Sequence, residues 1–502
     1  MPFPLVETRA YDNQPIAMCA ATGRRDGPWR GVTLAVADAP VKTSAVDPAT
    51  AALRSRMRRW LDDLYPTVDH RRLTIRTVLL TGLGIAVATV VNLFRTSGPG
   101  ALQTLWLEDV IIFLNGAYNM SFWHVILRPE VGYFHVVPRI LAEIAAAVPI
   151  RYAAPVLALE AATVWGVMAV IVFVASRPYL PRWWLRLLVA APVVLVPVGH
   201  TQVDNDVATL QFVFLYGLFW ILLWQPATRV GKVVAVVAVG LAATSGILSA
   251  VLIPLALLRL WAVRSWAARS VSLVYLAGMG MQLTSLAIGV AVPMARAGHY
   301  NPVWALKEYL ITGVPRSLFG ELWLGGPKVD VGGVPTAAYY TQSGTQVRLI
   351  VVALALLAAV MGCALLRVTR PHWPLAILAG VFSIAMFSEP TMIMGVVEPR
   401  YVVPPALLLY VSIVAMLRPR DGARRLRSSA PVVAFAVLIA VAAVANYRVD
   451  NARSASPAWR DKVREAVLYC QEWNPQAPYY YYGYEWWGMS IPCDRLRPHQ
   501  KA

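Results

Sequence analysis

Long apolar stretches alternate with short polar gaps over most of the chain, from about residue 76 to residue 446. A helix needs about 20 apolar residues to cross the hydrocarbon core of a bilayer, and several stretches approach that length. With the shorter stretches included, the pattern predicts about eleven membrane-spanning helices. They cover residues 76–94, 153–175, 184–198, 207–224, 230–243, 247–262, 270–293, 347–366, 373–388, 401–417 and 430–446. The expected fold is all-α, a polytopic transmembrane helical bundle.

The polar gap Thr244–Gly246 decides the count. The stretch 230–262 is either two short helices joined by a tight turn or one long kinked helix, which would reverse the sidedness of everything downstream. With a turn at this gap and a cytoplasmic N-terminus, every cytoplasmic loop is basic, as the positive-inside rule expects. Those loops are 176–186, 225–232, 259–270, 367–373 and 418–427.

Composition agrees with a membrane protein, because 58% of the 502 residues are hydrophobic and only 14% are charged. In a soluble protein the formal net charge of +18 would suggest nucleic acid. Here the basic residues gather in the gaps between apolar stretches, where Lys and Arg mark cytoplasmic loops. We therefore expect membrane lipids, and no nucleic acid, among the partners of the chain.

The chain divides into three parts on this pattern. Residues 1–75 are expected to form a cytoplasmic, largely disordered segment, within which 54–72 is a candidate interfacial helix. No apolar core follows the start, so this segment does not resemble a signal peptide. Residues 76–446 form the transmembrane module, and 447–502 form a small extracytoplasmic C-terminal tail.

The first outside loop contains the segment Arg128–Pro149, which has helical periodicity. Pro138 suits the first turn of a helix. Such a helix is too short and too polar to span, so it is expected to be amphipathic and to lie along the membrane surface. Its apolar face would carry Ile140, Leu141, Ile144 and Val148.

Three features stand out in the tail. Cys470 and Cys493 are the two cysteines expected outside the cell, and they are either disulfide-bonded, as an oxidising compartment favours, or buried free thiols. Ser456 and Pro457 suit the start of a helix. The aromatic run Pro478–Met489 fits a position at the membrane–water interface or a stacking surface for sugar rings.

Two adjacent carboxylates, Glu108 and Asp109, follow the first apolar stretch. Carboxylates at this depth are costly unless they face water or partners. They are either a solvated loop acid and a helix cap, or they line a cavity in which one of them acts as a base. Partial burial would raise the pKa of such a carboxyl group. His124, Arg128, His135 and Arg139 follow in the same loop.

Asp204 and Asp206 form a second acidic motif, "VDND", before a later apolar stretch. They either help to bind a divalent metal, which needs several oxygen ligands in one place, or they favour the positive end of the helix that follows. No phosphate-binding loop and no Cys/His zinc spacing is present.

The order of these motifs resembles the GT-C class of polytopic glycosyltransferases, which use polyprenyl-phosphate sugars as donors. The similarity extends over about Arg76–Asn446. It rests on the acidic pair, on "GYFHVVPRILA" (Gly132–Ala142), on "VDND" (Val203–Asp206), on "TSGILSAVLIPLALLRL" (Thr244–Leu260) and on "EPRYVVPPALLL" (Glu398–Leu409).

The resemblance implies a membrane enzyme, an inverting transferase that moves a sugar from the lipid donor to a hydroxyl of a glycan, lipid or protein acceptor of the cell envelope. It places the base in the first acidic motif, with Asp109 preferred to Glu108. Arg400 would grip the donor phosphate with two hydrogen bonds. Tyr401, His135 and Arg128 are further donor-binding candidates. Arg400 and Glu398 alternatively form a structural ion pair.

Two other classes of protein fit parts of the pattern. A transporter or flippase of lipid-linked saccharides would favour charges near the middle of spans, and repeated halves. The acids of this chain gather instead at the outside ends of helices, and no repeat is visible. A non-enzymatic scaffold leaves the acidic loop unexplained.

Overall fold

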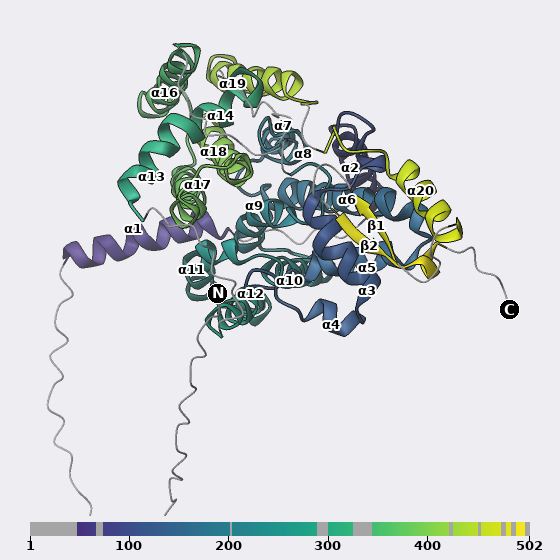
Figure 1. Cartoon of the computed structure of the whole chain (residues 1–502). Helices are drawn as coiled ribbons and strands as arrows, with labels where there is room; N and C mark the ends of the chain where they lie inside the picture. Colours follow the sequence, from purple (N-terminus) through teal and green to yellow (C-terminus); the bar gives the residue numbers. More distant parts are fainter. Residues whose placement is uncertain are drawn as a thin grey trace, which may run out of the picture. The chain divides into compact units, whose positions relative to one another are not determined.

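The computed structural model describes nine segments of the chain, and Figure 1 shows them in colour. They are residues 48–66, 74–200, 203–288, 300–324, 344–420, 425–449, 453–472, 478–482 and 488–496. The chain separates into two units, Met1–Arg54 and Ser55–Ala502. The segment 1–47, expected to be disordered, lies outside the described residues.

Seven helices of the described segments are long and apolar enough to cross a membrane. An all-α membrane bundle is therefore confirmed in its coarse form. These helices are α2 (Ile75–Leu93), α6 (Ala153–Ala175), α12 (Trp266–Ala287), α16 (Gly344–Leu365), α17 (Trp373–Met394), α18 (Val403–Met416) and α19 (Arg425–Ala445). Of these, α18 reaches the required length together with the short turn before it, which begins at Pro399.

The other four expected spans coincide with shorter helices, so the count of eleven stays a prediction. These helices are α7 (Trp183–Ala190) with α8 (Pro192–Leu195), α9 (Leu210–Leu223), α10 (Arg229–Ala243), and η4 (Ile247–Leu252) with α11 (Ile253–Ala262).

The outer helices turn apolar side chains away from the protein, as lipid contact requires. Leu79 and Leu83 of α2 are 66% and 60% exposed, and Val351 of α16 is 60% exposed. Every residue of α18, in contrast, is buried, and α9 is buried except at Gln211. A helix that is apolar on all sides belongs in the core of a large bundle.

The chain breaks between α10 and η4 at Thr244–Gly246, as the sequence pattern favours. This turn holds the start of α5 (Val136–Ala147). The backbone N–H of Val136 donates to the carbonyl of Thr244 over 3.2 Å, and the N–H of Val137 donates to the hydroxyl of Ser245 over 3.0 Å. Two otherwise unsatisfied groups at the N-terminus of α5 are thereby paired.

Helix α5 is the helix expected from the segment Arg128–Pro149. Its side toward the protein carries Pro138, Arg139 and small residues, whereas Ile144 on the other side is 49% exposed. The apolar face recognised in the sequence is therefore exposed at Ile144 and half-buried at Ile140, Leu141 and Val148, whereas the arginine is turned inward.

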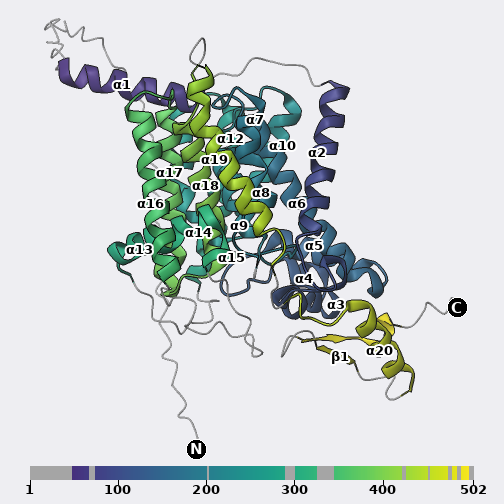
Figure 2. The same ribbon diagram turned by 90° about the horizontal axis from the view of Figure 1, so that it is seen from above.

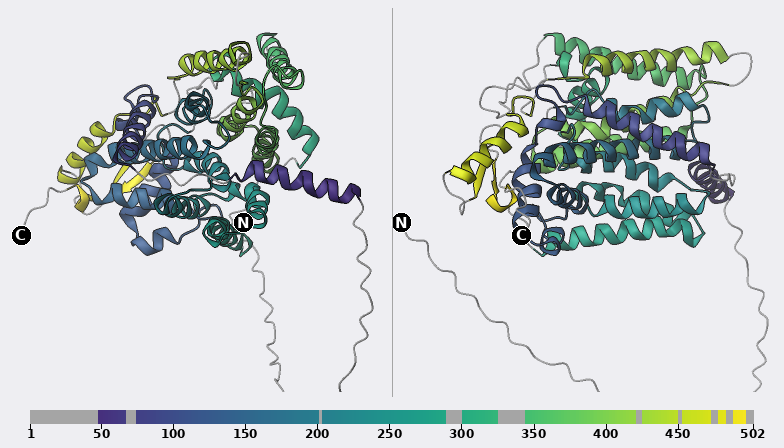
Figure 3. Two further views of the ribbon diagram at one scale, coloured as in Figure 1. Left: turned by 180° about the vertical axis from the view of Figure 1, so that it is seen from behind. Right: turned by 90° about the vertical axis from the view of Figure 1, so that its right-hand side faces the viewer.

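The two ends of the bundle carry different elements, as Figures 2 and 3 show. Across one end lies α1 (Pro48–Leu64), of which residues from Ser55 onward belong to the second unit. The other end carries the tail and the short elements η1 (Ala101–Gln103), η2 (Asp109–Leu114), α3 (Asn115–Asn119), α4 (Phe122–Ile126) and η3 (Ile150–Tyr152). Part of the segment expected to be largely disordered is thus helical.

A further group of short elements precedes α16. It comprises α13 (Pro302–Glu308), η5 (Tyr309–Gly313), α14 (Val314–Phe319) and α15 (Glu321–Leu324). The turn η7 (Pro399–Val402) leads into α18 and carries the "EPRY" motif.

The tail contains α20 (Trp459–Glu472), η8 (Cys493–Arg495) and a small antiparallel sheet that the sequence analysis did not anticipate. Strands β1 (Tyr479–Tyr482) and β2 (Gly488–Ile491) pair with Tyr479 opposite Ile491. Tyr481 packs on Trp459 with 5.2 Å between the rings, so part of the aromatic run forms the core of the tail. The remaining residues of the run, 483–487, lie outside the described segments.

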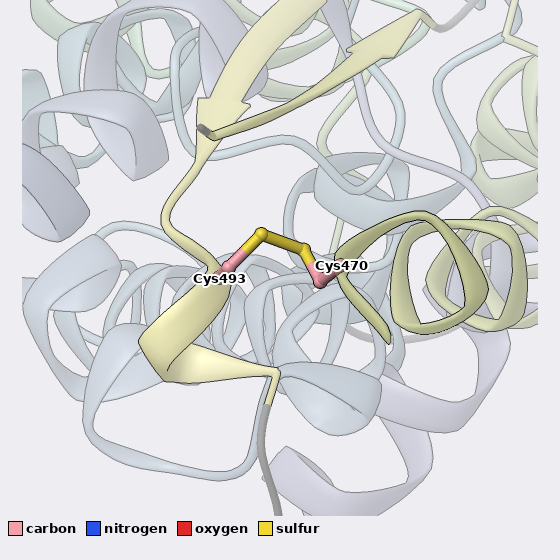
Figure 4. The surroundings of a disulfide bond; sticks show 2 residues. All are labelled: Cys470 and Cys493. Atoms are coloured by element: carbon pink, nitrogen blue, oxygen red, sulfur yellow. A yellow bond between two sulfur atoms is a disulfide. The ribbon is translucent and has the colours of Figure 1, made fainter. Parts of the chain in front are cut away.

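Cys470 of α20 and Cys493 of η8 form the expected disulfide (Figure 4). It closes the tail around the sheet. The tail in turn rests on the first loop, because the N–H of Ser490 donates to Oδ1 of Asn115 and the indole N–H of Trp459 donates to the carbonyl of Ile150.

Candidate functional site

The adjacent residues Glu108 and Asp109 stand at the start of the π-helical turn η2, and their side chains lie in different surroundings. Asp109 is 1% exposed, whereas the side chain of Glu108 is 27% exposed. Turns of π-helix are frequent at functional sites because they change the direction of successive side chains. The acidic pair of the sequence therefore serves two separate clusters.

Asp109 points into the protein and binds the loop that carries the second acidic motif. Its Oδ1 accepts the N–H groups of Val207 and Ala208 over 3.1 and 3.0 Å. Its Oδ2 lies 3.3 Å from the N–H of Val207. Both carboxylate oxygens are therefore engaged with the main chain.

Asp204 and Asp206 are buried in the same region, and each has its own partners. Asp206 accepts the N–H and the hydroxyl of Thr209 over 2.8 and 2.6 Å. Asp204 lies 2.9 Å from Nδ1 of His200 and 3.4 Å from Nη2 of Arg95. We call these three aspartates, with Arg95, His200 and Arg453, the acid network.

Arg453, from the segment between α19 and α20, fills the centre of the acid network. Its Nη1 donates to the carbonyls of Asp204 and Asn205, each over 2.7 Å. Its Nη2 and Nε donate to Ala101 and Thr104 of the first loop over 2.9–3.2 Å. The guanidinium thereby ties the start of the tail to both acidic loops.

The close approach of the tail to the first loop also explains why a glycine stands at position 98. Gly98 has a positive φ of 66°, and a Cβ at this position would collide with the carbonyl of Ser454. The chain on either side of Arg453 therefore passes directly over the loop that follows α2.

Burial and mutual repulsion set the charges of the acid network. Burial raises the pKa of Asp109 well above its usual value, and the carboxyl group of Asp206 raises it further, against the opposing effect of Arg453. Burial also raises the pKa of Asp206 to about 7, although Thr209 and Arg453 oppose the shift. Desolvation therefore favours the protonated form of both carboxyl groups relative to free aspartic acid.

Asp204 behaves differently. Burial works against its charged form, but the guanidinium of Arg95 and the side chain of His200 outweigh burial and bring its pKa below the usual value. Asp204 is therefore the ionised partner of Arg95, whereas burial holds the pKa values of Asp109 and Asp206 above their usual range.

Among the described residues, no group of three or more His, Cys, Asp or Glu side chains is placed to hold a metal ion. The acids of the network have main-chain, hydroxyl or guanidinium partners. The geometry of the described segments therefore gives no support to a divalent metal at Asp204 and Asp206.

A second cluster, partly open to the surface, surrounds Arg400 of η7. Nη2 of Arg400 lies 2.6 Å from Oε2 of Glu398, and its Nη1 lies 3.9 Å from Oε1 of Glu108. The guanidinium is also 5.5 Å from the ring centre of Tyr401, and the side chain of Arg400 is 23% exposed. We call Glu108, Glu398, Arg400, Tyr401 and Tyr133 the arginine cluster.

Tyr133, from the loop before α5, belongs to this cluster because Arg400, Tyr401 and Glu108 all influence its ionisation. Desolvation, the largest effect, raises the pKa of Tyr133 to about 12. The hydroxyl of Tyr133 therefore stays protonated at neutral pH and remains a hydrogen-bond donor.

His135 lies next to the cluster, where its ring is 4.5 Å from Tyr133 and 5.6 Å from Phe113. Burial, together with the charge of Arg139, lowers the pKa of His135 to about 3. The imidazole is therefore neutral and is no cation for a phosphate. Its buried Nδ1 has no hydrogen-bond partner among the described residues.

Arg139 and Arg128 are placed differently from Arg400. Arg139 is buried, lies over the ring of Phe113 at 5.7 Å and pairs with Glu130 at 3.6 Å. Arg128 contacts the sulfur of Met120 at 3.3 Å on the exposed side of the loop. No described contact joins Arg128 to the arginine cluster.

Three of these residues were not recognised in the sequence. Arg95 follows the first span at the end that was expected to face outward, where the positive-inside rule disfavours a cation, and this exception could have drawn attention to it. Tyr133 lies within the "GYFH" motif, but nothing singles it out there. Arg453 follows the last span in a segment without periodicity, and no local signal marks it.

Comparison with models of known protein families and with curated proteins finds no match to this chain. The chemistry of the site therefore rests on its own geometry. The arginine cluster offers an accessible carboxylate, a guanidinium and a phenol within one region at the tail end of the bundle.

Proposed function

We propose that the chain is a GT-C-type glycosyltransferase of the cell membrane that moves a sugar from a polyprenyl-phosphate donor to an acceptor hydroxyl. The observation that carries the proposal is the distance of 3.9 Å between Glu108 and Arg400. It joins a carboxylate of the first loop to a guanidinium of the "EPRY" motif. A sugar phosphate needs one group of each kind, a base for the acceptor and a cation for the leaving phosphate.

Arg400 is the phosphate ligand in this proposal. A guanidinium binds a phosphate with two parallel hydrogen bonds. In the structure it is held between Glu108 and Glu398. A donor phosphate would replace Glu108 at Nη1, while Glu398 continues to orient the guanidinium. Tyr401 is a further hydrogen-bonding partner of Arg400, and Tyr133 interacts with it electrostatically.

Glu108 is the general base in this proposal, in place of Asp109, which the sequence analysis preferred. Both oxygens of Asp109 accept main-chain N–H groups and its side chain is almost completely buried. An acceptor hydroxyl would reach it only if residues 207 and 208 moved. The side chain of Glu108 is 27% exposed, and donor binding at Arg400 would free its Oε1.

The reaction then balances without another reagent. Glu108 takes the proton of the acceptor hydroxyl, and the oxygen attacks the anomeric carbon from the face opposite the phosphate. The bond between the anomeric carbon and the phosphate oxygen breaks, and its electron pair leaves with polyprenyl phosphate. The transition state has the oxocarbenium character familiar from glycoside hydrolysis. Arg400 stabilises the charge that develops on the phosphate.

Asp109 has a positioning role. It fixes the loop 206–209 through two main-chain N–H groups, and that loop leads directly into α9. The acid network as a whole holds the first loop, the second acidic motif and the start of the tail in one arrangement. Glu108 of the arginine cluster belongs to one of the segments that the acid network holds in place.

The proposed topology has eleven spans, a cytoplasmic N-terminus and an extracytoplasmic C-terminus. The basic loops 176–186, 225–232, 259–270, 367–373 and 418–427 support it. The disulfide of the tail also supports it, because disulfides persist in oxidising compartments. The arginine cluster would then face the outer leaflet.

Incubation of the purified full-length protein with a panel of polyprenyl-phosphate sugars and simple acceptors tests the function. Release of polyprenyl phosphate together with a new glycoside is the expected result. Binding of lipid-linked sugars without any release, combined with movement of labelled lipid across vesicle membranes, would favour a flippase instead.

A further inference from the structure

A separate cavity of about 540 Å³ is lined by residues of α1, of the start of α17 and of the segment after α18. We call it the α1 pocket. Figures 2 and 3 show that α1 lies at the end of the bundle opposite the tail. Small-molecule sites commonly have volumes of about 300–1,000 Å³. Its walls are Arg56, Arg59, Trp60 and Asp63 of α1, residues 370–374 before and at the start of α17, and Arg418 after α18.

The α1 wall is one face of a helix, because Arg56, Arg59, Trp60 and Asp63 are spaced three, four and seven residues from the first. The end of α1 is fixed to the bundle. Its Leu64 carbonyl accepts the hydroxyl of Tyr179 over 2.6 Å. Gln225 donates to the carbonyl of Tyr65 over 2.9 Å. The guanidinium groups of Arg56 and Arg59 are therefore held on the side of α1 that faces residues 370–374.

The opposite wall is equally well fixed. The N–H groups of Arg370 and His372 donate to the carbonyls of Arg418 and Ala415 over 2.8 and 2.9 Å. His372 caps α17 by accepting the N–H of Leu375. The N-terminus of α17, the positive end of its helix dipole, therefore lies at this wall and adds to the charge of the arginines.

Charge identifies the class of ligand. Four guanidinium groups line the pocket, and Asp63 is its only carboxylate among the lining residues. Guanidinium groups bind phosphate oxygens with paired, charge-assisted hydrogen bonds. The lining therefore suits an anion with several oxygen atoms, such as a phosphate ester.

The surroundings identify the source of that phosphate. Trp60 and Trp373 form aromatic walls, and tryptophan is enriched where protein meets the membrane–water interface. Leu365 and Leu366, next to the loop, are 64% and 80% exposed. The acyl chains of a lipid whose phosphate is bound in the pocket could thus lie along α16.

We infer that the α1 pocket binds the phosphate headgroup of an anionic phospholipid from the leaflet on which α1 lies. The inference does not depend on sugar transfer at the other end of the bundle. Bound lipid would tie α1 to the loop between α16 and α17, and to α18, so it would stabilise the end of the bundle that is remote from the arginine cluster.

Thermal unfolding of the full-length protein in neutral detergent tests the inference. Dioleoylphosphatidylglycerol should raise the melting temperature more than dioleoylphosphatidylcholine at the same concentration. The double variant R59Q/R370Q should need at least about tenfold more phosphatidylglycerol for half of the effect, because each lost charge-assisted hydrogen bond weakens binding about tenfold. The single variant R59Q should show part of this loss.

Arg58 provides the matched control, because it is an exposed arginine of α1 outside the pocket lining. R58Q should respond to phosphatidylglycerol like the wild type. An equal loss in R58Q and R59Q would mean only general surface attraction and would overturn the inference. Equal effects of the two lipids would overturn it too. Full stabilisation by glycerol 3-phosphate alone would overturn the assignment to a lipid.

Discussion

Nη1 of Arg400 lies 3.9 Å from Oε1 of Glu108, although the two residues are far apart along the chain, near the beginning and the end of the transmembrane module. Each belongs to a motif that is weak on its own. Their proximity turns two separate sequence features into one site, with a carboxylate and a guanidinium that both reach the surface. Asp109, the neighbour of Glu108, faces the interior instead.

The first prediction compares the two members of the acidic pair. Glu108→Gln should lower turnover by about 10²–10⁴-fold, because it removes general-base catalysis at nearly constant size. Asp109→Asn should reduce turnover much less, since an amide oxygen can still accept the N–H groups of residues 207 and 208. Initial rates on one donor and acceptor pair provide the measurement. A larger loss in Asp109→Asn than in Glu108→Gln would return the base to Asp109.

The second prediction concerns Arg400. Arg400→Lys keeps the positive charge but loses the planar pair of hydrogen bonds. The donor concentration for half-maximal rate should therefore rise by about tenfold or more, as expected when charge-assisted hydrogen bonds are lost. Arg128→Lys is the control, because Arg128 contacts Met120 outside the arginine cluster. Unchanged donor dependence in Arg400→Lys would remove this residue from the phosphate site.

The third prediction concerns the centre of the acid network. Arg453→Met removes a buried cation and leaves four main-chain carbonyls without it. The free energy of unfolding should fall by about 3–5 kcal/mol, as for other broken buried charge networks. The exposed Arg460 of α20 is the control, and Arg460→Met should stay within about 0.5 kcal/mol. Unfolding in mixed detergent micelles measures both, and equal values would show that the network contributes little.

The fourth prediction concerns pH. The pKa of Asp206 is raised from its unfolded value of 3.8 to about 7, so the folded state binds more protons between these values. Stability should therefore be greatest at low pH within this window and should fall as the pH rises towards 7. Asp206→Asn keeps an oxygen for Thr209 and cannot ionise. The melting temperature of this variant should lose that part of the pH dependence, and an unchanged slope between pH 5 and 7 would contradict the assignment.

The fifth prediction concerns sidedness. Single cysteines at the exposed positions Asn119 in the first loop and Ala455 in the tail should both react with an impermeant reagent added outside intact cells. A cysteine at Arg58 of α1 should react only after the membrane is opened. The reason is that the first loop and the tail share hydrogen bonds at one end of the bundle, whereas α1 lies across the other. Reaction of Arg58→Cys from outside would exclude the proposed topology.

The sequence alone was sufficient for the class of fold and for several local features. Bilayer thickness fixes the length of a spanning helix, so apolar stretches such as 345–365 are recognisable without any tertiary contact. The break at Thr244–Gly246 followed from loop charge. For Cys470 and Cys493 the sequence left a disulfide and two buried free thiols open, and the structure shows the disulfide.

Tertiary structure decided the site. Periodicity does not say which of two adjacent acids turns inward, because a π-helical turn at Asp109–Leu114 depends on what packs around it. Long-range partners are equally invisible in a local pattern, and Arg453 reaches the acid network only because the chain after α19 folds back over Gly98. The hairpin of β1 and β2 also needed the tail to close on itself, since its short aromatic strands pack on Trp459 and Tyr469. The position of a spanning helix is determined by the bilayer that surrounds it, so a local apolar stretch reveals it. The charges of a buried site are determined by neighbours that are distant along the chain.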